Sequence, residues 1–203
     1  MNSKGKIGIL KLPNRGNLNS IKDALEYCDA NAGFIETNDD FNKFDKIVIP
    51  GVGAFNKTIE NIIDKDMKNE LVVNVKNKIT LGICLGMQLF AKSSDEIQLT
   101  EGLNILNCNV KKIKTKYPLP VIGYNNIKIT SDNKLLKNID ESDQFYFMHS
   151  YAVSSTENQI ASVKYHNTEY TAAVAKDNVF GVQFHIEKSK KSGIKVINNF
   201  LNL

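Results

Sequence analysis

A single junction between a strand-like and a helix-like segment constrains the fold of this 203-residue chain more than any other feature. An apolar run ends at Cys84, and a helix-forming run, residues 85–91, follows with no linker. Gly82 and Gly86 flank the cysteine in the pattern Gly-x-Cys-x-Gly, the thiol version of the Gly-x-Ser-x-Gly nucleophile elbow. Backbone N–H groups at the start of the helix favour a thiolate there. The spacing therefore predicts an α/β fold in which Cys84 is a covalent catalyst.

Strand-like and helix-like segments alternate through the first half of the chain. The expected strands are residues 6–12, 33–37, 44–50 and 79–84. The expected helices are residues 20–31, stopped by Gly33, and residues 58–75. This alternation predicts a doubly wound, mostly parallel sheet that binds ligands at the carboxyl ends of its strands. Cys84 lies at such an end.

The second half of the chain is richer in strands. The expected strands are residues 103–113, 126–130, 144–153, 160–165, 171–176 and 179–187, and the last helix is expected over residues 189–203. Asp177 and Asn178 are expected to form a hairpin turn. These patterns predict an antiparallel or mixed extension of the sheet. Because no linker rich in Pro, Gly or Ser divides the halves, we expect residues 1–203 to form a single domain.

Composition excludes several classes of protein. The net charge of +4 is too small to indicate a nucleic-acid partner. No signal-peptide core is present, and no apolar stretch approaches the ~20 residues that span a bilayer, so we expect a soluble, cytoplasmic protein. Cys28, Cys84 and Cys108 are an odd number of cysteines at unrelated spacings, which fits neither a disulfide framework nor a zinc site. We expect Cys28 and Cys108 to be core thiols, and we expect no metal or cofactor.

A cysteine nucleophile needs a base, and the chain offers three histidines. His185 is followed two residues later by Glu187. In an extended strand these positions face the same way, roughly 6.6 Å apart at Cα. Glu187 would then orient the imidazole, and the second ring nitrogen would take the thiol proton. His149 has no acidic residue two positions away and is interpreted as a structural or pocket-lining residue, and His166 as a surface-loop residue.

A third element would stabilise an oxyanion. The strand expected over residues 44–50 ends in Pro50, and Gly51 and Gly53 follow. The glycines allow backbone N–H groups to face inward where a side chain would block them. Together with the N–H of Leu85, such donors would stabilise a tetrahedral oxyanion by ~3 kcal/mol each.

Several segments together resemble the class I, or triad, glutamine amidotransferases. They are residues 50–55, 82–88, 147–151 and 181–189. Within that class the likeness is greatest to the glutaminase subunits of imidazole glycerol phosphate synthase, because residues 16–20 also look like the first-strand loop of that group. The resemblance covers nearly the full chain.

The resemblance implies a function and a set of site residues. In the family, a triad forms a γ-glutamyl thioester from L-glutamine, and the released ammonia reaches a (β/α)8-barrel cyclase partner in a heterodimer. In histidine biosynthesis this synthase makes imidazole glycerol phosphate and AICAR. The implied site residues are Cys84, His185 and Glu187 as the triad; Gly51, Val52 and Gly53 as the oxyanion strand, with a Val52 peptide expected to turn; Gln88, Glu96, His149, Ser150 and Tyr151 around glutamine; and Asn17 and Lys188 toward the synthase subunit.

The chain departs from the family pattern at three places. Ile186 stands where Pro is usual, residues 12–17 replace a Tyr-Gly-x-Gly-Asn loop, and Tyr124 replaces Trp. None of these changes removes a catalytic group, but we expect the first and third to lie near the partner, so the ammonia acceptor stays open. A related subunit that amidates nucleotide-linked or surface-polysaccharide sugars is one alternative. A self-contained γ-glutamyl cysteine hydrolase and a non-catalytic binding subunit are the others.

Overall fold

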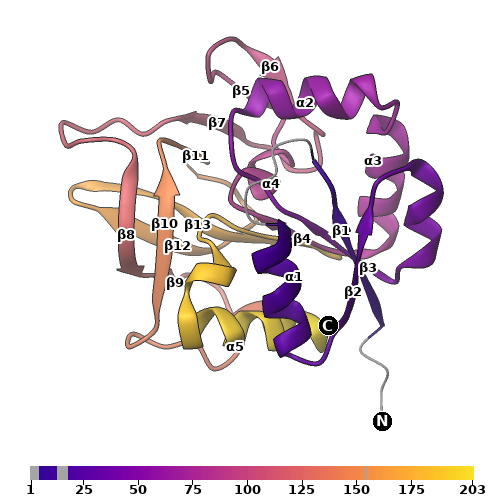
Figure 1. Cartoon of the computed structure of the whole chain (residues 1–203). Helices are drawn as coiled ribbons and strands as arrows, with labels where there is room; N and C mark the ends of the chain where they lie inside the picture. The colour runs from indigo at the N-terminus through magenta and orange to yellow at the C-terminus, as the bar shows by residue number, and fades with distance from the viewer. Residues whose placement is uncertain (1–4, 13–17, 154) are drawn as a thin grey trace.

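The computed structural model describes residues 5–12, 18–153 and 155–203, and an eight-stranded sheet runs through it (Figure 1). Its strand order is β2-β1-β3-β4-β14-β13-β12-β9. The pairs from β2 to β14 are parallel, and the pairs from β14 to β9 are antiparallel. The bounds are β1 (Lys6–Leu10), β2 (Asn31–Ile35), β3 (Lys46–Ile49), β4 (Ile79–Ile83), β9 (Lys128–Ile129), β12 (Gln159–Tyr165), β13 (Thr168–Lys176) and β14 (Val179–Val182). The predicted parallel sheet with an antiparallel extension is confirmed.

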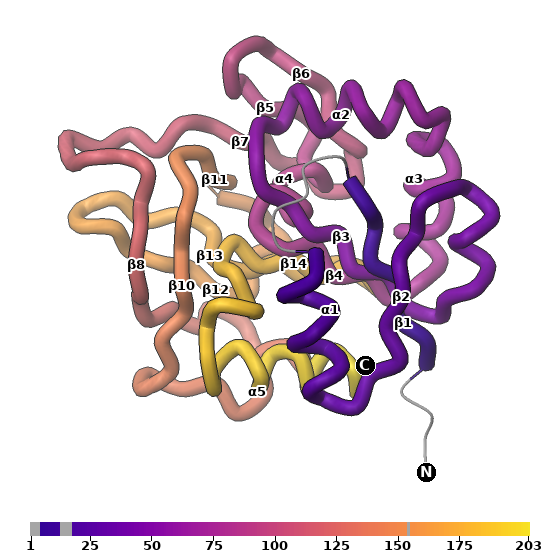
Figure 2. The backbone as a smooth tube through the Cα atoms, in the orientation of Figure 1, coloured from indigo at the N-terminus to yellow at the C-terminus, as the bar shows by residue number. Residues whose placement is uncertain are grey.

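Helices cover both faces of this sheet (Figure 2). The bounds are α1 (Leu18–Tyr27), α2 (Phe55–Asp64), α3 (Lys68–Asn77), α4 (Leu85–Gln88) and α5 (Lys190–Leu201), with short 3₁₀ helices η1 (Asn38–Lys43), η2 (Lys134–Leu136) and η3 (Ile186–Lys188). Side chains of β3 alternate between the two resulting cores: Val48 packs with α1 and α5, whereas Ile47 and Ile49 pack with α2, α3 and α4. No helix in the described part of the chain is long and apolar enough to cross a membrane.

Two smaller sheets occupy the second half of the chain. In one, β10 (Gln144–His149) pairs with β8 (Val121–Asn126); the other has the order β11-β7-β5-β6, with β11 (Tyr151–Val153), β7 (Asn109–Lys112), β5 (Ser93–Ser94) and β6 (Thr100–Glu101). The single strand predicted over residues 144–153 is therefore wrong. At Ser150 the chain passes from one sheet to the other, and the Ser150 carbonyl accepts a hydrogen bond from Ile113.

Other predicted boundaries change because tertiary contacts override local pattern. The helix predicted over residues 58–75 is two helices, α2 and α3. Asp66 has a φ of 52°, and the Met67 N–H donates to the Ile62 carbonyl across the break. Both helices thereby keep their apolar faces on one core. Gly33 does not stop α1 but lies inside β2, whereas the hairpin turn predicted at Asp177 and Asn178 does join β13 to β14.

The elbow helix α4 is a single turn, shorter than the run to residue 91 that the sequence predicts. Past Gln88 the turn tightens, because the N–H groups of Phe90 and Ala91 donate to carbonyls three residues back instead of four. The free carbonyls at the end of this turn accept from another segment. The Leu89 carbonyl accepts from the Leu103 N–H at 2.8 Å, and the Phe90 carbonyl accepts from the Ile105 N–H at 2.9 Å. Because N–H groups of residues 103–106 donate to this turn, residues 103–108 form no strand. The strand predicted over residues 103–113 is reduced to β7.

Three glycines permit the elbow to lie directly against the end of β3. A Cβ on Gly86 would come within 1.8 Å of the Ile49 carbonyl oxygen, and one on Gly51 within 2.6 Å of the Gly86 nitrogen. A Cβ on Gly82 would come within 2.7 Å of the Gly86 carbonyl oxygen. These distances are far shorter than van der Waals contact between backbone atoms. The glycines of Gly-x-Cys-x-Gly are therefore required by the close approach of two backbones.

Substituting Gly86 tests this packing. Gly86→Ala is expected to lower the free energy of unfolding by about 3 kcal/mol or more, because the new methyl group can be accommodated only by separating β3 from the elbow. Urea unfolding measures the change. Lys57→Ala, on the exposed face of α2, is the control, and a loss in Gly86→Ala no larger than that of the control would contradict the packing argument.

Candidate active site

Cys84 occupies the strained turn between β4 and α4. Its backbone has φ 53° and ψ −111°, an uncommon conformation for a residue other than glycine. The conformation is held by the structure on both sides: the Cys84 N–H donates to the Val182 carbonyl at 2.7 Å, and the Cys84 carbonyl accepts from the Gln88 N–H at 3.2 Å. The sulfur-bearing residue is only 6% exposed. This is the geometry that the nucleophile-elbow pattern predicts.

His185 and Glu187 are brought together beside this cysteine. The Nδ1 of His185 lies 2.8 Å from the Oε1 of Glu187, and both side chains are almost fully buried. The Cys84 side chain is close enough to raise the pKa of the His185 imidazole. Because Glu187 engages Nδ1, Nε2 is the ring nitrogen left for the sulfur. The structure thus assembles the three residues in the order that a triad requires.

The reason for the His185–Glu187 contact differs from the one that the sequence suggests. Residues 179–187 do not form one strand: β14 ends at Val182, and Glu187 lies in the 3₁₀ turn η3. His185 makes only an isolated bridge to Tyr146 of β10. The alternation of an extended strand is therefore the wrong explanation, although the predicted pair is correct. A tight turn after His185 folds the carboxylate back onto its imidazole.

A buried hydroxyl fixes this turn. The Oγ of Ser189 donates to the His185 carbonyl at 2.6 Å and accepts from the Tyr146 N–H at 3.0 Å. The His185 N–H in turn donates to the Tyr146 carbonyl at 2.9 Å. Ser189 is 1% exposed, so water does not compete for these hydrogen bonds. Ser189 therefore fastens the segment that carries the imidazole to β10.

The surroundings of His185 favour its protonated form. Burial lowers the pKa of the imidazole, but the hydrogen bonds to Cys84 and Glu187 outweigh burial and raise the pKa to about 10. A proton delivered to this ring is thus held firmly. The arrangement is suited to accepting a proton from the thiol.

The other predicted site residues gather around a small pocket at Cys84. Its volume is about 100 Å³, and its lining consists of Gly51, Val52, Gly53, Cys84, Leu85, Gln88, Glu96, Met148, His149, Ser150, Tyr151 and His185. All four residues of the predicted oxyanion group and all five of the predicted substrate group are among them. Gly53 has a φ of 110°, a conformation that glycine adopts readily.

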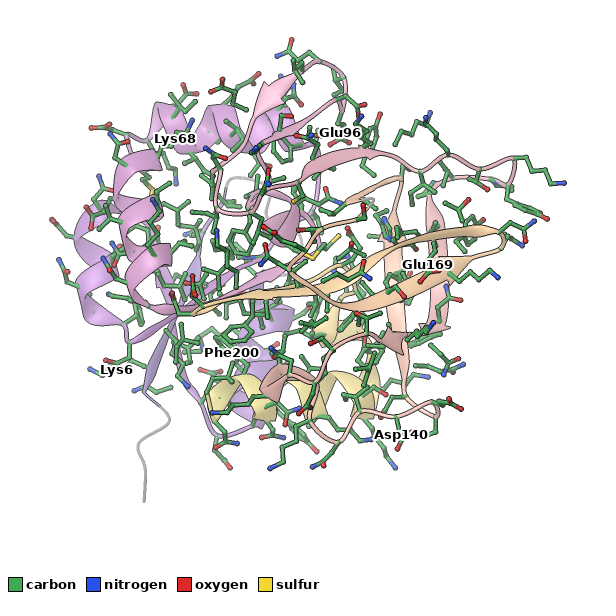
Figure 3. The ribbon with its side chains drawn as sticks, turned by 180° about the vertical axis from the view of Figure 1, so that it is seen from behind. Lys6, Lys68, Glu96, Asp140, Glu169 and Phe200 are labelled. Atoms are coloured by element: carbon green, nitrogen blue, oxygen red, sulfur yellow. The ribbon has the colours of Figure 1, made fainter. Side chains whose placement is uncertain are left out.

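Glu96 reaches the pocket from the segment that follows β5 (Figure 3). Its Oε2 accepts from the N–H of Phe55, the first residue of α2, at 2.8 Å. The carboxylate therefore joins the loop after β3 to the far wall of the pocket. An acidic group here adds negative charge to one end of the site.

The backbone carbonyl of Tyr151 organises the polar wall. It accepts from the Nε2 of Gln88 at 2.7 Å and bonds the Nδ1 of His149 at 2.9 Å. Because a carbonyl only accepts, Nδ1 of His149 carries the proton. Burial and, to a smaller extent, the charge of the nearby His185 outweigh the hydrogen bond to Tyr151 and lower the pKa of His149 to about 4. His149 is therefore neutral near pH 7, as a pocket-lining histidine.

Of the two residues predicted to face a partner, the structure describes Lys188. Asn17 lies outside the described residues. Lys188 packs its Nζ 5.5 Å from the ring centre of Tyr146, and its carbonyl accepts from the Tyr124 hydroxyl at 2.9 Å. Lys190 lies 5.0 Å from the ring centre of Tyr124. These lysines cover two aromatic rings beside the triad.

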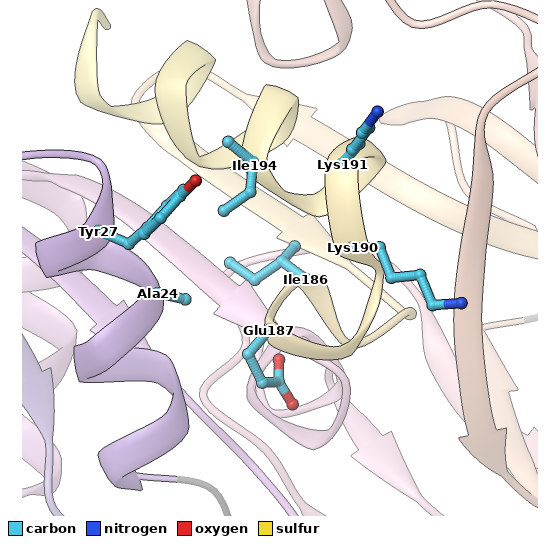
Figure 4. Close-up of a pocket in the computed structure, with 7 residues that line it drawn as sticks. All are labelled: Ala24, Tyr27, Ile186, Glu187, Lys190, Lys191 and Ile194. Carbon is cyan, nitrogen blue, oxygen red and sulfur yellow. The ribbon is translucent and has the colours of Figure 1, made fainter.

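Glu187 lines a second, larger pocket (Figure 4). This pocket has a volume of about 420 Å³ and lies between α1 and the start of α5. Ala24 and Tyr27 line it from α1, and Lys190 and Lys191 from α5. The described residues contain no cluster of three or more His, Cys, Asp or Glu side chains that could hold a metal ion.

Sequence reasoning missed two residues at the site. Gln183 is fully buried, and its side chain contacts Cys84, while Ser189 fixes the triad turn as described above. A signal for Gln183 is present in the sequence, because it is a polar residue in the otherwise apolar run from Val179 to Phe184. No comparable local signal marks Ser189, since its partners come from a distant strand.

Removing the Ser189 hydroxyl tests whether it holds the turn after His185 against β10. Ser189→Ala leaves the Tyr146 N–H without its acceptor and the His185 carbonyl with the weaker bond from the Lys188 N–H, so the free energy of unfolding is expected to fall by about 2 kcal/mol. Urea unfolding measures it. Ser142→Ala removes an exposed serine hydroxyl and is the control. Equal losses of unfolding free energy in the two variants would show that Ser189 does not hold this turn in place.

The lowered pKa of His149 makes a prediction about acid stability. An unfolded histidine has a pKa near 6.5, so between about pH 6.5 and pH 4 the unfolded chain binds a proton that the folded chain does not. Stability should therefore fall as the pH drops through this window, by about 2 kcal/mol at pH 5. His149→Gln should lose this part of the pH dependence in urea titrations at pH 7 and pH 5. His166→Gln, at an exposed loop, should keep it; equal pH dependence in all three proteins would contradict the assignment.

Comparison with known proteins identifies the family. The model of the glutamine amidotransferase class-I family matches residues 15–203. A protein named imidazole glycerol phosphate synthase subunit HisH from Methanocaldococcus jannaschii is 40% identical over 200 residues, which cover 97% of this chain and 99% of that protein. One named subunit HisH 2 from Methanococcus maripaludis is 42% identical over 197 residues, covering 92% and 94%.

Solved structures agree on the fold. PurLQS from Thermotoga maritima has a TM-score of 0.77 at 16% identity, over 97% of each chain. A glutamine amidotransferase crystal structure has a TM-score of 0.75 at 15% identity, over 98% of this chain and 100% of that one. The strained cysteine, the buried His–Glu pair and these likenesses converge: the chain belongs to the class-I glutamine amidotransferases.

Proposed function

We propose that this chain is the glutaminase subunit of an imidazole glycerol phosphate synthase. It hydrolyses L-glutamine to glutamate and ammonia and supplies the ammonia to a (β/α)8-barrel cyclase subunit that makes imidazole glycerol phosphate and AICAR. The observation that carries the proposal is that Cys84 and His185 line one pocket, with Glu187 bonded to the far side of the imidazole. The subunit assignment is supported by the HisH relatives, which match over nearly their whole length.

The first half-reaction is acyl transfer to sulfur. Cys84 gives its proton to Nε2 of His185, and the thiolate attacks the side-chain amide carbon of glutamine. The C–S bond forms while the carbonyl π electrons move to oxygen. When the tetrahedral intermediate collapses, the C–N bond breaks, and the proton on His185 leaves with the nitrogen as ammonia. A γ-glutamyl thioester remains on Cys84.

The second half-reaction returns the enzyme to its starting state. His185 takes a proton from water, and the resulting hydroxide attacks the thioester carbon. The C–S bond breaks, the electron pair returns to sulfur, and the proton on His185 restores the thiol. Glutamate is the second product. Glu187 holds the imidazole in one orientation through both halves and stabilises its charged form.

Backbone N–H groups at the pocket would stabilise the oxyanion. The candidates are Leu85, the residue after the nucleophile, and the segment Gly51–Gly53, which lines the pocket beside it. Gly51 lies in close contact with Leu85 and Gly86, and this contact keeps the segment Gly51–Gly53 beside the Leu85 N–H. We propose that a turn of the Val52 peptide completes the hole when glutamine is bound.

The polar wall fits the two ends of free glutamine. Both N–H bonds of the Gln88 amide are used inside the protein, toward Tyr151 and Gln183. Gln88 therefore offers the substrate its carbonyl oxygen, which suits the N–H groups of the glutamine side chain. Glu96 supplies a carboxylate for the substrate's α-ammonium group. Lys188 and Asn17 are proposed to face the synthase subunit.

Two measurements test this function. The isolated chain should hydrolyse L-glutamine weakly, and the rate should rise steeply when the cyclase subunit and its ligand are added. Cys84→Ala should abolish glutamine-dependent synthesis by the complex but leave ammonia-dependent synthesis intact, because only the acyl-transfer step uses the sulfur. Cys108→Ala, at a buried thiol outside the site, is the control.

The outcomes separate the alternatives. Equal glutaminase activity with and without the cyclase subunit would contradict ammonia delivery and favour a self-contained hydrolase. Loss of both activities in Cys84→Ala would show that Cys84 serves folding or assembly instead. Retention of glutamine-dependent synthesis in that variant would exclude the thioester.

A further inference from the structure

A buried glutamine outside the triad contacts the proposed nucleophile. The Nε2 of Gln183 lies 3.5 Å from the sulfur of Cys84, a hydrogen-bonding distance for an N–H donor and a sulfur acceptor. Gln183 is fully buried, and its backbone N–H donates to the Ala172 carbonyl of β13 at 2.8 Å. The residue is thus fixed in place two positions before His185. A buried amide of this kind is stable only where its polar atoms find hydrogen-bond partners.

The orientation of the Gln183 amide follows from its neighbours. The Tyr151 carbonyl can only accept, so it must face the amino group of Gln88. That amino group also lies 3.0 Å from the Oε1 of Gln183, which must therefore be the oxygen. The amino group of Gln183 is left to face the sulfur of Cys84. A flipped amide at either glutamine would place two donors or two acceptors together.

We propose that Gln183 is a catalytic residue of the glutaminase reaction, whose side-chain amide donates a hydrogen bond to the Cys84 sulfur and stabilises its thiolate. The proposal rests on the proposed function, because it concerns the same thiolate. In the resting enzyme the bond favours transfer of the thiol proton to His185. In the second half-reaction it stabilises the thiolate that leaves when the thioester C–S bond breaks. A hydrogen bond to a charged acceptor in a buried site is stronger than one to a neutral thiol.

The same geometry connects the nucleophile to the substrate wall. Gln88 lines the glutamine pocket and also holds Gln183 in its donating orientation. Removing the Gln88 amide would release the Gln183 side chain from this restraint. The reactivity of Cys84 should therefore depend on Gln88 even when no glutamine is present.

Alkylation of Cys84 by iodoacetamide tests the proposal without glutamine or a partner. The thiolate displaces iodide and forms a C–S bond, so the rate reports how much thiolate is present. Rates are measured on the full chain from pH 5 to pH 10, and mass spectrometry of the Cys84 peptide distinguishes this adduct from adducts at Cys28 and Cys108. Failure of the proposed glutaminase function would not affect this readout.

Gln183→Met keeps the length of the side chain but removes the donor. Its alkylation profile is expected to move to higher pH, with a rate at pH 7 about tenfold below that of the wild type. Gln183→Glu places a carboxylate at the sulfur and should slow alkylation further. Gln88→Met retains Gln183 and should shift the profile in the same direction by a smaller amount. Gln144→Met makes the same change at an exposed glutamine and is the control.

Urea unfolding identifies the variants that fold. A shift in any folded Gln183 variant that exceeds the shift in Gln144→Met supports the proposal. An unchanged profile in a folded Gln183 variant overturns it. If neither Gln183 variant folds, Gln88→Met decides the outcome, since an unchanged profile there would show that the oriented amide does not act on the sulfur.

Discussion

The site depends on the contact between two backbones, one at the end of β3 and one at the elbow after β4. Gly86 lies against the Ile49 carbonyl with no room for a side-chain carbon, and Gly51 lies against the first turn of α4. This contact holds the proposed oxyanion segment beside the nucleophile. It also fixes the strained conformation of Cys84, which a free chain would not retain. The positions of the thiol, the proposed oxyanion donors and the pocket are thus set by one packing interface.

A second set of constraints consists of hydrogen bonds that begin at the Tyr151 carbonyl. This one acceptor fixes the amide of Gln88 and the tautomer of His149. Gln88 then fixes Gln183, which meets the sulfur. The carbonyl is available because the chain leaves β10 at Ser150 and enters β11 in another sheet. A break in the strand pattern therefore produces the polar wall of the pocket.

Sequence patterns predicted the alternating elements well and their ends poorly. The parallel sheet, the elbow and the turn at Asp177 follow from periodicity and turn chemistry, which are local. The elbow helix stops at Gln88, where hydrogen bonds three residues apart replace those four apart, and the N–H groups of residues 103–106 donate to the free carbonyls of this tight turn. The break between α2 and α3 likewise lets both helices keep their apolar faces on the same core. Such competition for hydrogen bonds and surface is not encoded in any single window of sequence.

The sequence by itself determined which residues we propose to carry the chemistry, because a thiol between two glycines and a histidine two residues before a glutamate are chemical patterns. It also determined the family, through motifs spread along the chain. Only the tertiary structure decided how these groups meet. Glu187 reaches His185 through a 3₁₀ turn that Ser189 fastens to β10, and Gln183 meets Cys84 through amides aligned by a distant carbonyl. Hydrogen bonds between segments far apart in the chain set these orientations, and local sequence cannot specify them.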